Sequence, residues 1–306
     1  MAHTRRNGTD PLFRWLTRTF ALAVLALAVL IAVELCLNSR LSWQRFGLHF
    51  LWSSTWDPVA GQFGALPFIY GTLVTTLIAL ALAVPLGLGT AICLVELAPP
   101  RVSSWLGFLV ELLAAIPSVI YGLVGIVVLV PWIRHVLEPV LSRTLGFLPF
   151  FQGAPYGVGF LAAGLVLTVM VVPYVTSVSR EVLLAVPRAQ REAALALGAT
   201  RWEVLWTAVM PYARSGIVAA ILLALARALG ETMAVTMVIG NRPQIAASLF
   251  EPGYTLSAII ANEFTEATGQ LYLHALVEIG LVLFVMTVII NGLARLILAR
   301  LALRRS

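Results

Sequence analysis

The sequence of 306 residues contains no lysine, so each of its 20 basic residues is an arginine. A P-loop grips the nucleotide's phosphates with the lysine of its Gly-Lys-Ser/Thr end, and Schiff-base chemistry also needs an amine. The chain therefore cannot be a P-loop ATPase by itself. If ATP drives its activity, a partner subunit must bind the ATP and Mg²⁺, and we expect no cofactor in this chain.

Cysteine and histidine are also scarce. Cys36 and Cys93 lie in separate apolar runs, and the four histidines are scattered without an HExxH pattern or an i, i+4 pair. Because a metal site needs several such ligands at a suitable spacing, we expect no metal site. We interpret the two cysteines as small buried hydrophobic residues.

Charge of either sign is rare. Charged residues form 11% of the chain and hydrophobic residues 60%, with a mean hydropathy of +0.95. Soluble domains carry about 25% charged residues, so this composition is typical of integral membrane proteins. Apolar runs long enough to span a bilayer, about 20 residues, occur at about 20–37, 68–95, 109–133, 157–177, 215–239 and 272–298. We therefore predict an all-α membrane protein with six transmembrane helices.

The arginines predict the orientation of these helices. With a cytoplasmic N-terminus, 14 arginines fall in inside segments and five in outside segments, and Arg227 alone lies within a span. Lys and Arg concentrate on the cytoplasmic side of membrane proteins. The bias predicts that both termini are cytoplasmic. The first apolar run is interpreted as an anchor helix, because it is long for a cleaved signal peptide and no small-residue cleavage site follows it.

A segment between the fourth and fifth runs has its own helix signals. It reads PRAQREAALALGATRWEVLWTAVMPY, residues 187–212. Pro187 suits a first helical position, and Gly198 suits the residue after a helix end. Thr200 and Glu203 have the spacing of a capping box. The segment therefore predicts a helix over 188–197, a turn, and a second helix that ends near Met210, before Pro211.

Both predicted helices carry an apolar face. The residues on these faces are Ala193, Ala194 and Leu197 on the first helix, and Trp202, Leu205 and Val209 on the second. Such a face packs on the chain itself, on the lipid surface or on a partner. A DNA-binding helix-turn-helix does not fit, because spans begin within a few residues on both sides. We therefore expect no nucleic-acid partner.

The motif Glu192-Ala193-Ala194, followed by Gly198 and by Met210-Pro211, resembles the EAA loop of ABC importer permeases. That family's pattern is EAA, three residues, Gly, nine residues and Ile-x-Leu-Pro. Ala208 and Met210 replace its Ile and Leu and remain apolar. The resemblance implies a type I ABC importer permease fold. It also implies that Glu192, Ala193, Ala194 and Gly198 shape a coupling helix that docks on an ATPase subunit.

Three further stretches narrow the resemblance. GTLVTTLIALALAVPLGLGTAICLVEL (71–97) resembles the first core helix of these permeases. AAIPSVIYGLVG (114–125) and RALGETMAVTMVIGN (227–241) are similar to phosphate-importer permeases, and the second of them is closer to the PstC type than to the PstA type. The resemblance implies a multi-pass protein of the bacterial inner (plasma) membrane that transports inorganic phosphate. The implied partners are membrane lipid, a second homologous permease (PstA type), two ATP-binding subunits (PstB type) and an extracytoplasmic phosphate-binding protein (PstS type).

This resemblance covers nearly the whole chain and divides it into three parts. Residues 1–67 would form the N-terminal cytoplasmic tail, the first transmembrane helix and an external loop. Residues 68–298 would form the permease core, with five transmembrane helices and the cytoplasmic EAA loop at about 187–212. Residues 299–306 would form a short basic cytoplasmic tail.

Arg227 and Glu231 are the main candidate site residues. The fifth apolar run, about 215–239, has its midpoint near 227, where an arginine costs about 2.5–3.5 kcal/mol to insert. Four residues apart, the two side chains share a helix face and can pair. One interpretation is an ion pair that fixes the helix bundle. The other is a substrate pathway, in which the guanidinium binds an oxyanion and faces an aqueous cavity. The resemblance implies that both residues are needed for phosphate uptake.

Other polar residues within the spans are possible pathway liners, or ordinary helix–helix hydrogen bonders. They are Thr72, Thr75, Thr76, Ser118, Tyr121, Thr232 and Glu278. No nucleophile–base pair is apparent, so we expect a transport subunit and not an enzyme. Two alternatives to a phosphate permease stay open. One is an importer of another oxyanion, sulfate or molybdate, and the other is a proton-coupled secondary transporter with Glu231 as the proton relay.

Overall fold

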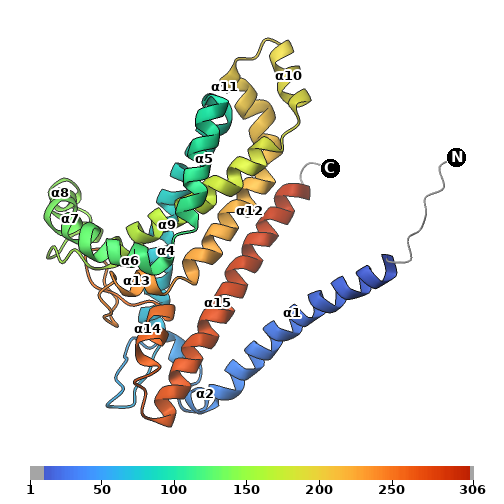
Figure 1. The fold of residues 1–306 in the computed structure, drawn as a ribbon. Coiled ribbons are helices and arrows are strands. Elements are labelled where there is room, and N and C mark those ends of the chain that lie inside the picture. The colour runs from blue at the N-terminus through green and yellow to red at the C-terminus, as the bar shows by residue number, and fades with distance from the viewer. Residues whose placement is uncertain (1–9, 304–306) are drawn as a thin grey trace.

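The computed structural model describes residues 10–303, almost all of them helical (Figure 1). Within that range the only extended pairing is an isolated bridge between Asp57 and Gln62. Six helical segments are long and apolar enough to cross a membrane: Phe13–Asn38, Leu66–Leu97, Ser118–Leu145, Phe160–Leu184, Arg201–Leu229 and Gln270–Leu296. The prediction of an all-α protein with six spans is confirmed. Residues 1–9 of the predicted N-terminal tail and 304–306 of the C-terminal tail lie outside the described residues.

The elements follow one another in a fixed order. The α-helices are α1 (Asp10–Asn38), α2 (Arg40–Phe46), α3 (His49–Trp52), α4 (Leu66–Ile92), α5 (Pro100–Ala114), α6 (Ser118–Val124), α7 (Val130–Trp132), α8 (Glu138–Leu145), α9 (Phe160–Leu184), α10 (Arg188–Ala196), α11 (Arg201–Val204), α12 (Met210–Leu229), α13 (Met233–Thr236), α14 (Leu256–Glu263) and α15 (Gln270–Leu303). Four π-helical turns are η1 (Cys93–Leu97), η2 (Gly125–Leu129), η3 (Ile133–Leu137) and η5 (Leu205–Val209), and η4 (Pro149–Phe151) is a 3₁₀ turn.

The third span is shifted from the predicted 109–133 to Ser118–Leu145. The predicted run contains a break, because α5 ends at Ala114 and Pro117 has an extended backbone with ψ 138°. Proline disfavours the helical conformation of the residue before it, and a hydropathy average does not register this effect. α5 has 15 residues and reaches about 22 Å, which is short of a bilayer core of about 30 Å.

Each π turn precedes a proline by the same distance. The prolines are Pro99, Pro131, Pro139 and Pro211, each two residues after the last residue of its π turn. In each case the residue before the proline donates its N–H to the carbonyl five residues back. Proline has no N–H and clashes with the carbonyl four residues back, and the wider turn relieves both problems. At Pro211 the helix therefore continues into α12, and the prediction that Pro211 ends it is wrong.

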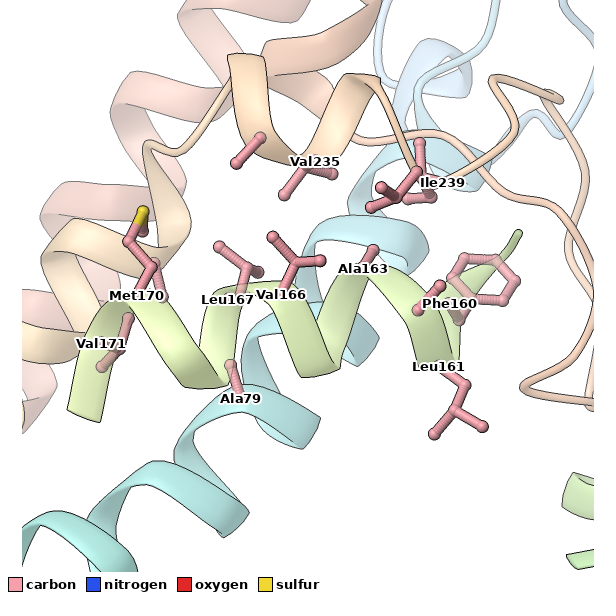
Figure 2. Packing of buried hydrophobic residues seen from close by; sticks show 14 of the residues in the cluster. Ala79, Phe160, Leu161, Ala163, Val166, Leu167, Met170, Val171, Val235 and Ile239 are labelled. Atoms are coloured by element: carbon pink, nitrogen blue, oxygen red, sulfur yellow. The ribbon is translucent and has the colours of Figure 1, made fainter. Parts of the chain in front are cut away.

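α9 lies at the centre of the largest hydrophobic cluster. Figure 2 shows Val235 and Ile239 packed over one face of α9, with Ala79 of α4 against another face. α4 and α9 make the most extensive contact between any two helices of the described chain. A Cβ at Gly164 of α9 would lie 2.5 Å from Ile78 Cγ2 of α4, so the helices approach as closely as they do because this position is glycine.

Two smaller clusters stabilise the ends of the bundle. One joins α3, α14 and α15 through buried side chains that include Phe50, Leu256 and Leu276. The other lies beneath α10 and α11 and includes Leu183 and Val209. These clusters anchor the short helices at opposite ends of α9 and α15 (Figure 1).

α1 stands apart from this core. It packs on α15 and α2 near its C-terminal end and leans away from the other helices (Figure 1), and its most apolar stretch has no buried residue within the chain. Cys36 on α1 and Cys93 on η1 are both exposed, so the prediction that they are buried is wrong. An apolar run in a membrane helix needs no protein cover, because lipid supplies the apolar surroundings.

Candidate functional site

Arg227 lies in the last turn of α12, near the end of the fifth span. The hydropathy had placed it at the midpoint of that span. α12 ends at Leu229, and the chain is non-helical through Gly230 and Glu231 before α13 begins. The apolar residues of α13 extended the hydropathy signal beyond this break. A helix C-terminus carries a partial negative charge, which favours a cation in the last turn. The arginine therefore sits where the helix itself stabilises it.

The Arg227 guanidinium is loosely held. Its Nη2 lies 3.6 Å from Glu231 Oε2, and the two side chains are 40% and 3% exposed within this chain. The predicted pair is present, but 3.6 Å is beyond hydrogen-bond range. Nη2 also donates a long contact of 4.0 Å to Met170 Sδ, and Cζ lies 5.7 Å from the ring centre of Tyr174. A guanidinium has five N–H donors, so most of them stay available to a ligand.

Glu231, in contrast, is fixed in place. Its Oε1 accepts a hydrogen bond from the backbone N–H of Ala234 at 3.3 Å. Its backbone carbonyl accepts one from the Ser257 hydroxyl of α14 at 2.6 Å. The carboxylate therefore holds a defined position beside a half-exposed arginine. Ser257 was not predicted from the sequence, because only the folded chain brings α14 to this break.

Tyr174, whose ring contacts Arg227, and Tyr121 both form hydrogen bonds with the end of α5. The Tyr174 hydroxyl donates to the Ala114 carbonyl at 3.0 Å, and the Tyr121 hydroxyl donates to the Leu113 carbonyl at 2.7 Å. Both acceptors lie in the last turn of α5, whose final carbonyls have no partner within the helix. Ser118 follows at the start of α6. The site thus forms where the ends of several helices meet the middle of α9. Tyr174 carried no sequence signal.

Three of the four predicted threonine liners have hydrogen-bond partners within the chain. Thr72 Oγ1 donates to the Phe68 carbonyl at 2.8 Å and accepts from the Leu256 N–H at 3.0 Å, which joins α4 to α14. Thr75 donates to its own helix, and Thr232 makes only a 3.4 Å contact with the Gly230 carbonyl. Thr72 thus matches the helix–helix alternative. The buried Thr76 hydroxyl has no hydrogen-bond partner among the described residues.

Glu278 occupies a different place. Its side chain is 1% exposed, and neither carboxylate oxygen has a hydrogen-bond partner in the described part of the chain. It lines a 450 Å³ cavity together with Cys36 of α1, Trp43 of α2 and apolar residues of α15. The structure does not bring Glu278 together with Arg227.

The loop predicted at 187–212 forms as the short helix α10, a sharp turn, and α11, which continues through η5 into α12. α10 ends at Ala196, Gly198 has φ +86°, and Thr200 and Glu203 make both hydrogen bonds of a capping box. Leu197 is 90% exposed. A left-handed φ favours glycine, which explains the residue at this turn.

The two apolar faces of this loop have different surroundings. Leu205 and Val209 are buried in the cluster beneath the loop, so this part packs on the chain itself. Ala193, Leu197 and Trp202 are exposed, and Glu192 is exposed beside them. The exposed face is therefore free to contact a partner.

Comparison with known proteins first defines the class. Residues 83–303 match the family model described as "Binding-protein-dependent transport system inner membrane component". A chain of a bacterial alginate ABC transporter, in complex with its alginate-bound periplasmic protein, superposes with a TM-score of 0.59 over 95% of this chain and 96% of that chain, at 17% identity. A chain of the inward-facing MetNI methionine ABC transporter gives 0.56 over 81% and 99%, at 19% identity. The fold is that of ABC importer permeases, which are multi-pass membrane subunits.

Sequence relatives then narrow the class. The phosphate transport system permease protein PstC of Mesorhizobium japonicum is 46% identical over 97% of this chain and 92% of its own length. PstC of Pasteurella multocida is 45% identical over 94% and 91%, and PstC 2 of Mycobacterium tuberculosis is 40% identical over 91% and 87%. The chain belongs to the PstC family of phosphate transport permeases, as the motifs implied.

Proposed function

We propose that this chain moves inorganic phosphate across the bacterial inner membrane, as one permease subunit of an ATP-driven importer. Its PstC relatives support the substrate, and the Arg227 site supports the chemistry. The sulfate, molybdate and proton-coupled alternatives have no comparable support, because the relatives reported above are phosphate permeases.

The observation that carries this proposal is the half-exposed, weakly paired guanidinium of Arg227. A planar guanidinium can engage two oxygens of a tetrahedral oxyanion at once. Glu231 lies 3.6 Å away and is fixed by its own hydrogen bonds, so it repels a phosphate that approaches Arg227 too closely. Transport needs such moderate binding, because a carrier must also release its cargo.

The break after α12 supports the same interpretation. Non-helical backbone within a membrane is tolerated where protein buries it or where it lines a water-filled cavity. Glu231 is buried, whereas Gly230 and Arg227 are exposed. The break therefore borders open space on the side of Arg227. In the proposed transporter, this space belongs to a phosphate path shared with a second, PstA-type permease.

Energy would enter through the loop at 187–212. Its exposed small and apolar residues, Ala193, Leu197 and Trp202, suit a groove on a PstB-type ATP-binding subunit. Two such subunits would bind the ATP and Mg²⁺, since this chain has no P-loop lysine. The loop and both termini would then face the cytoplasm. A PstS-type binding protein would deliver phosphate at the opposite surface.

Uptake by the purified complex tests this proposal. The chain is reconstituted into lipid vesicles with its second permease and ATP-binding subunits, and the binding protein and ³²P-phosphate are added on the outer face. We expect phosphate uptake that requires ATP at the loop side and that excess sulfate or molybdate does not reduce. Uptake without ATP would overturn the ATP-driven mechanism, and equal competition by sulfate would overturn the substrate.

A further inference from the structure

Arg191 connects the exposed α10 helix to two core helices. It directly precedes Glu192, and its Nη2 lies 3.0 Å from Glu96 Oε1 at the end of the second span. The same Nη2 donates a hydrogen bond of 2.9 Å to the backbone carbonyl of Leu183, in the last turn of α9. Arg191 and Glu96 are 23% and 24% exposed, so both are largely shielded by the chain. One guanidinium therefore links α10 to two core helices, namely α9 and α4, the latter through its continuation η1.

The contact of Arg191 with α9 leads directly to the Arg227 site. Leu183 and Tyr174 lie on the same uninterrupted helix, nine residues and thus about 13 Å apart. Tyr174 and Met170 are the α9 residues that contact the Arg227 guanidinium. A displacement of α10 that pulls on the Leu183 carbonyl would therefore move the ring against which Arg227 rests.

The Arg191 contacts are not needed merely to hold α10 in place. α10 is already held by its Gly198 turn and by half-buried Ala194 against the cluster beneath the loop. Lysine would place a charge near Glu96, but arginine extends further and has more donors in fixed directions. The Arg191 bridge, defined as Arg191 with Glu96 and Leu183, adds a polar link at the point where the loop meets both core helices.

We propose that Arg191 is the positioning residue that transmits movement of α10 to α9 and α4, and so to the Arg227 site. The inference rests on the proposed function, because it assumes that an ATP-binding subunit displaces α10. Arg191 itself does not contact the substrate. Loss of Arg191 should uncouple ATP hydrolysis from phosphate transport, while the complex still hydrolyses ATP and still binds phosphate.

The test compares variants of the complete reconstituted complex. For Arg191→Ala and Glu96→Gln we expect intact assembly, continued ATP hydrolysis and an unchanged phosphate KM for uptake. The maximal uptake rate should fall at least tenfold, so that the ATP hydrolysed per phosphate rises by a similar factor. Arg101→Ala, at an exposed arginine outside the loop at 187–212, is the control and should behave like the wild type.

A charge reversal distinguishes transmission from stability. The double variant Glu96→Arg with Arg191→Glu restores the ion pair in the opposite sense but leaves the Leu183 carbonyl without its donor. We therefore expect this variant to assemble and hydrolyse ATP while its uptake stays at least tenfold below the wild type. Normal coupling in Arg191→Ala, or wild-type uptake by the double variant, would overturn the proposal. If Arg191→Ala fails to assemble, the uptake rates of Glu96→Gln and of the double variant test the proposal instead. If the wild-type complex hydrolyses ATP but takes up no phosphate, the proposed function is contradicted instead. In that case, the effect of Arg191→Ala would be measured on the stimulation of ATP hydrolysis by the binding protein.

Discussion

Two arginine–glutamate pairs of the described residues contact α9 from other segments, and they differ in almost every physical respect. The Arg227–Glu231 pair is local, separated by 3.6 Å, and its arginine is 40% exposed while its glutamate is buried. The Arg191–Glu96 pair joins distant segments at 3.0 Å, with both side chains about three-quarters shielded. Arg191 also donates to a main-chain carbonyl, whereas Arg227 has only a sulfur and an aromatic ring beside it.

The difference separates an arginine that the chain holds on two sides from one that it has left available. Arg191 has an ion-pair partner at the end of one core helix and a hydrogen-bond acceptor on another, so replacing those contacts with a ligand would cost it direct interactions. Arg227 has a carboxylate that is near but does not form a hydrogen bond, and its side chain is 40% exposed. An ion pair alone therefore does not indicate a structural role, because the distance and exposure of each partner decide what else the arginine can bind.

The largest effect should follow from removing the available arginine. Arg227→Gln deletes the charge and the paired donors, and each charged hydrogen bond contributes about 1.5–3 kcal/mol. With two such bonds lost, phosphate uptake should fall by about 100-fold or more. ³²P-phosphate uptake by reconstituted vesicles measures this, with assembly and ATPase activity recorded in parallel.

Arg143→Gln is the matched control for this change. Arg143 also lies in the last turn of a helix, α8, and is exposed. Uptake by Arg143→Gln should stay within twofold of the wild type. If Arg227→Gln transports as well as Arg143→Gln, Arg227 is not required for phosphate passage.

A second prediction sharpens the loop side of the comparison. Leu197→Asp places a charge on a residue that is 90% exposed and forms part of the proposed ATPase contact. Burying an unpaired carboxylate in an interface is costly, so the affinity for the ATP-binding subunit should fall at least tenfold. Pull-down of the ATP-binding subunit measures this. Val59→Asp, at a fully exposed position in another loop, should retain normal binding; equal losses in both variants would contradict the assignment.

A third prediction concerns α9, the helix that both pairs contact. Gly164→Ala would place a Cβ 2.5 Å from Ile78 of α4, and overpacking of this kind destabilises by about 1–3 kcal/mol. Gly89→Ala has no atom within 4 Å of the new Cβ and should be neutral or slightly stabilising. Thermal unfolding of the complex in detergent compares the two. Equal midpoints would show that the close α4–α9 contact does not limit stability.

The smallest effect should come from the cap of α11. Thr200→Ala removes the side chain that accepts from the Glu203 N–H, and loss of such a cap costs about 1 kcal/mol. Hydrogen exchange of the amides of residues 199–204 should accelerate about fivefold, while uptake stays within twofold of the wild type. Unchanged exchange would mean that packing of the loop, and not its cap, fixes this turn.

The sequence predicted those features that depend on neighbouring residues. The Gly198 turn and the Thr200–Glu203 capping box are local, so their residues alone indicated them. Six apolar runs predicted six spans, because span length follows from bilayer thickness. Fold and family were therefore accessible before any coordinates.

Other features depend on contacts between distant segments or on breaks that hydropathy averages across. The break after Leu229 was missed because the residues of α13 are apolar again, and this placed Arg227 at a false midpoint. Tyr174 and Ser257 meet the Arg227 site from other helices. Glu96 meets Arg191 across 95 positions of the sequence. No periodic pattern in the sequence indicates contacts between such distant residues.

Chemical rescue tests whether a water-accessible cation at position 227 is required for phosphate passage. Arg227→Cys is prepared after both native cysteines, Cys36 and Cys93, have been replaced by serine. The account predicts that this variant is inactive and that its thiol reacts with aminoethyl methanethiosulfonate from water. The attached ammonium should restore measurable phosphate uptake, whereas a neutral reagent of similar size should not. A thiol that cannot be labelled, or an unlabelled variant that transports at the wild-type rate, would contradict the account.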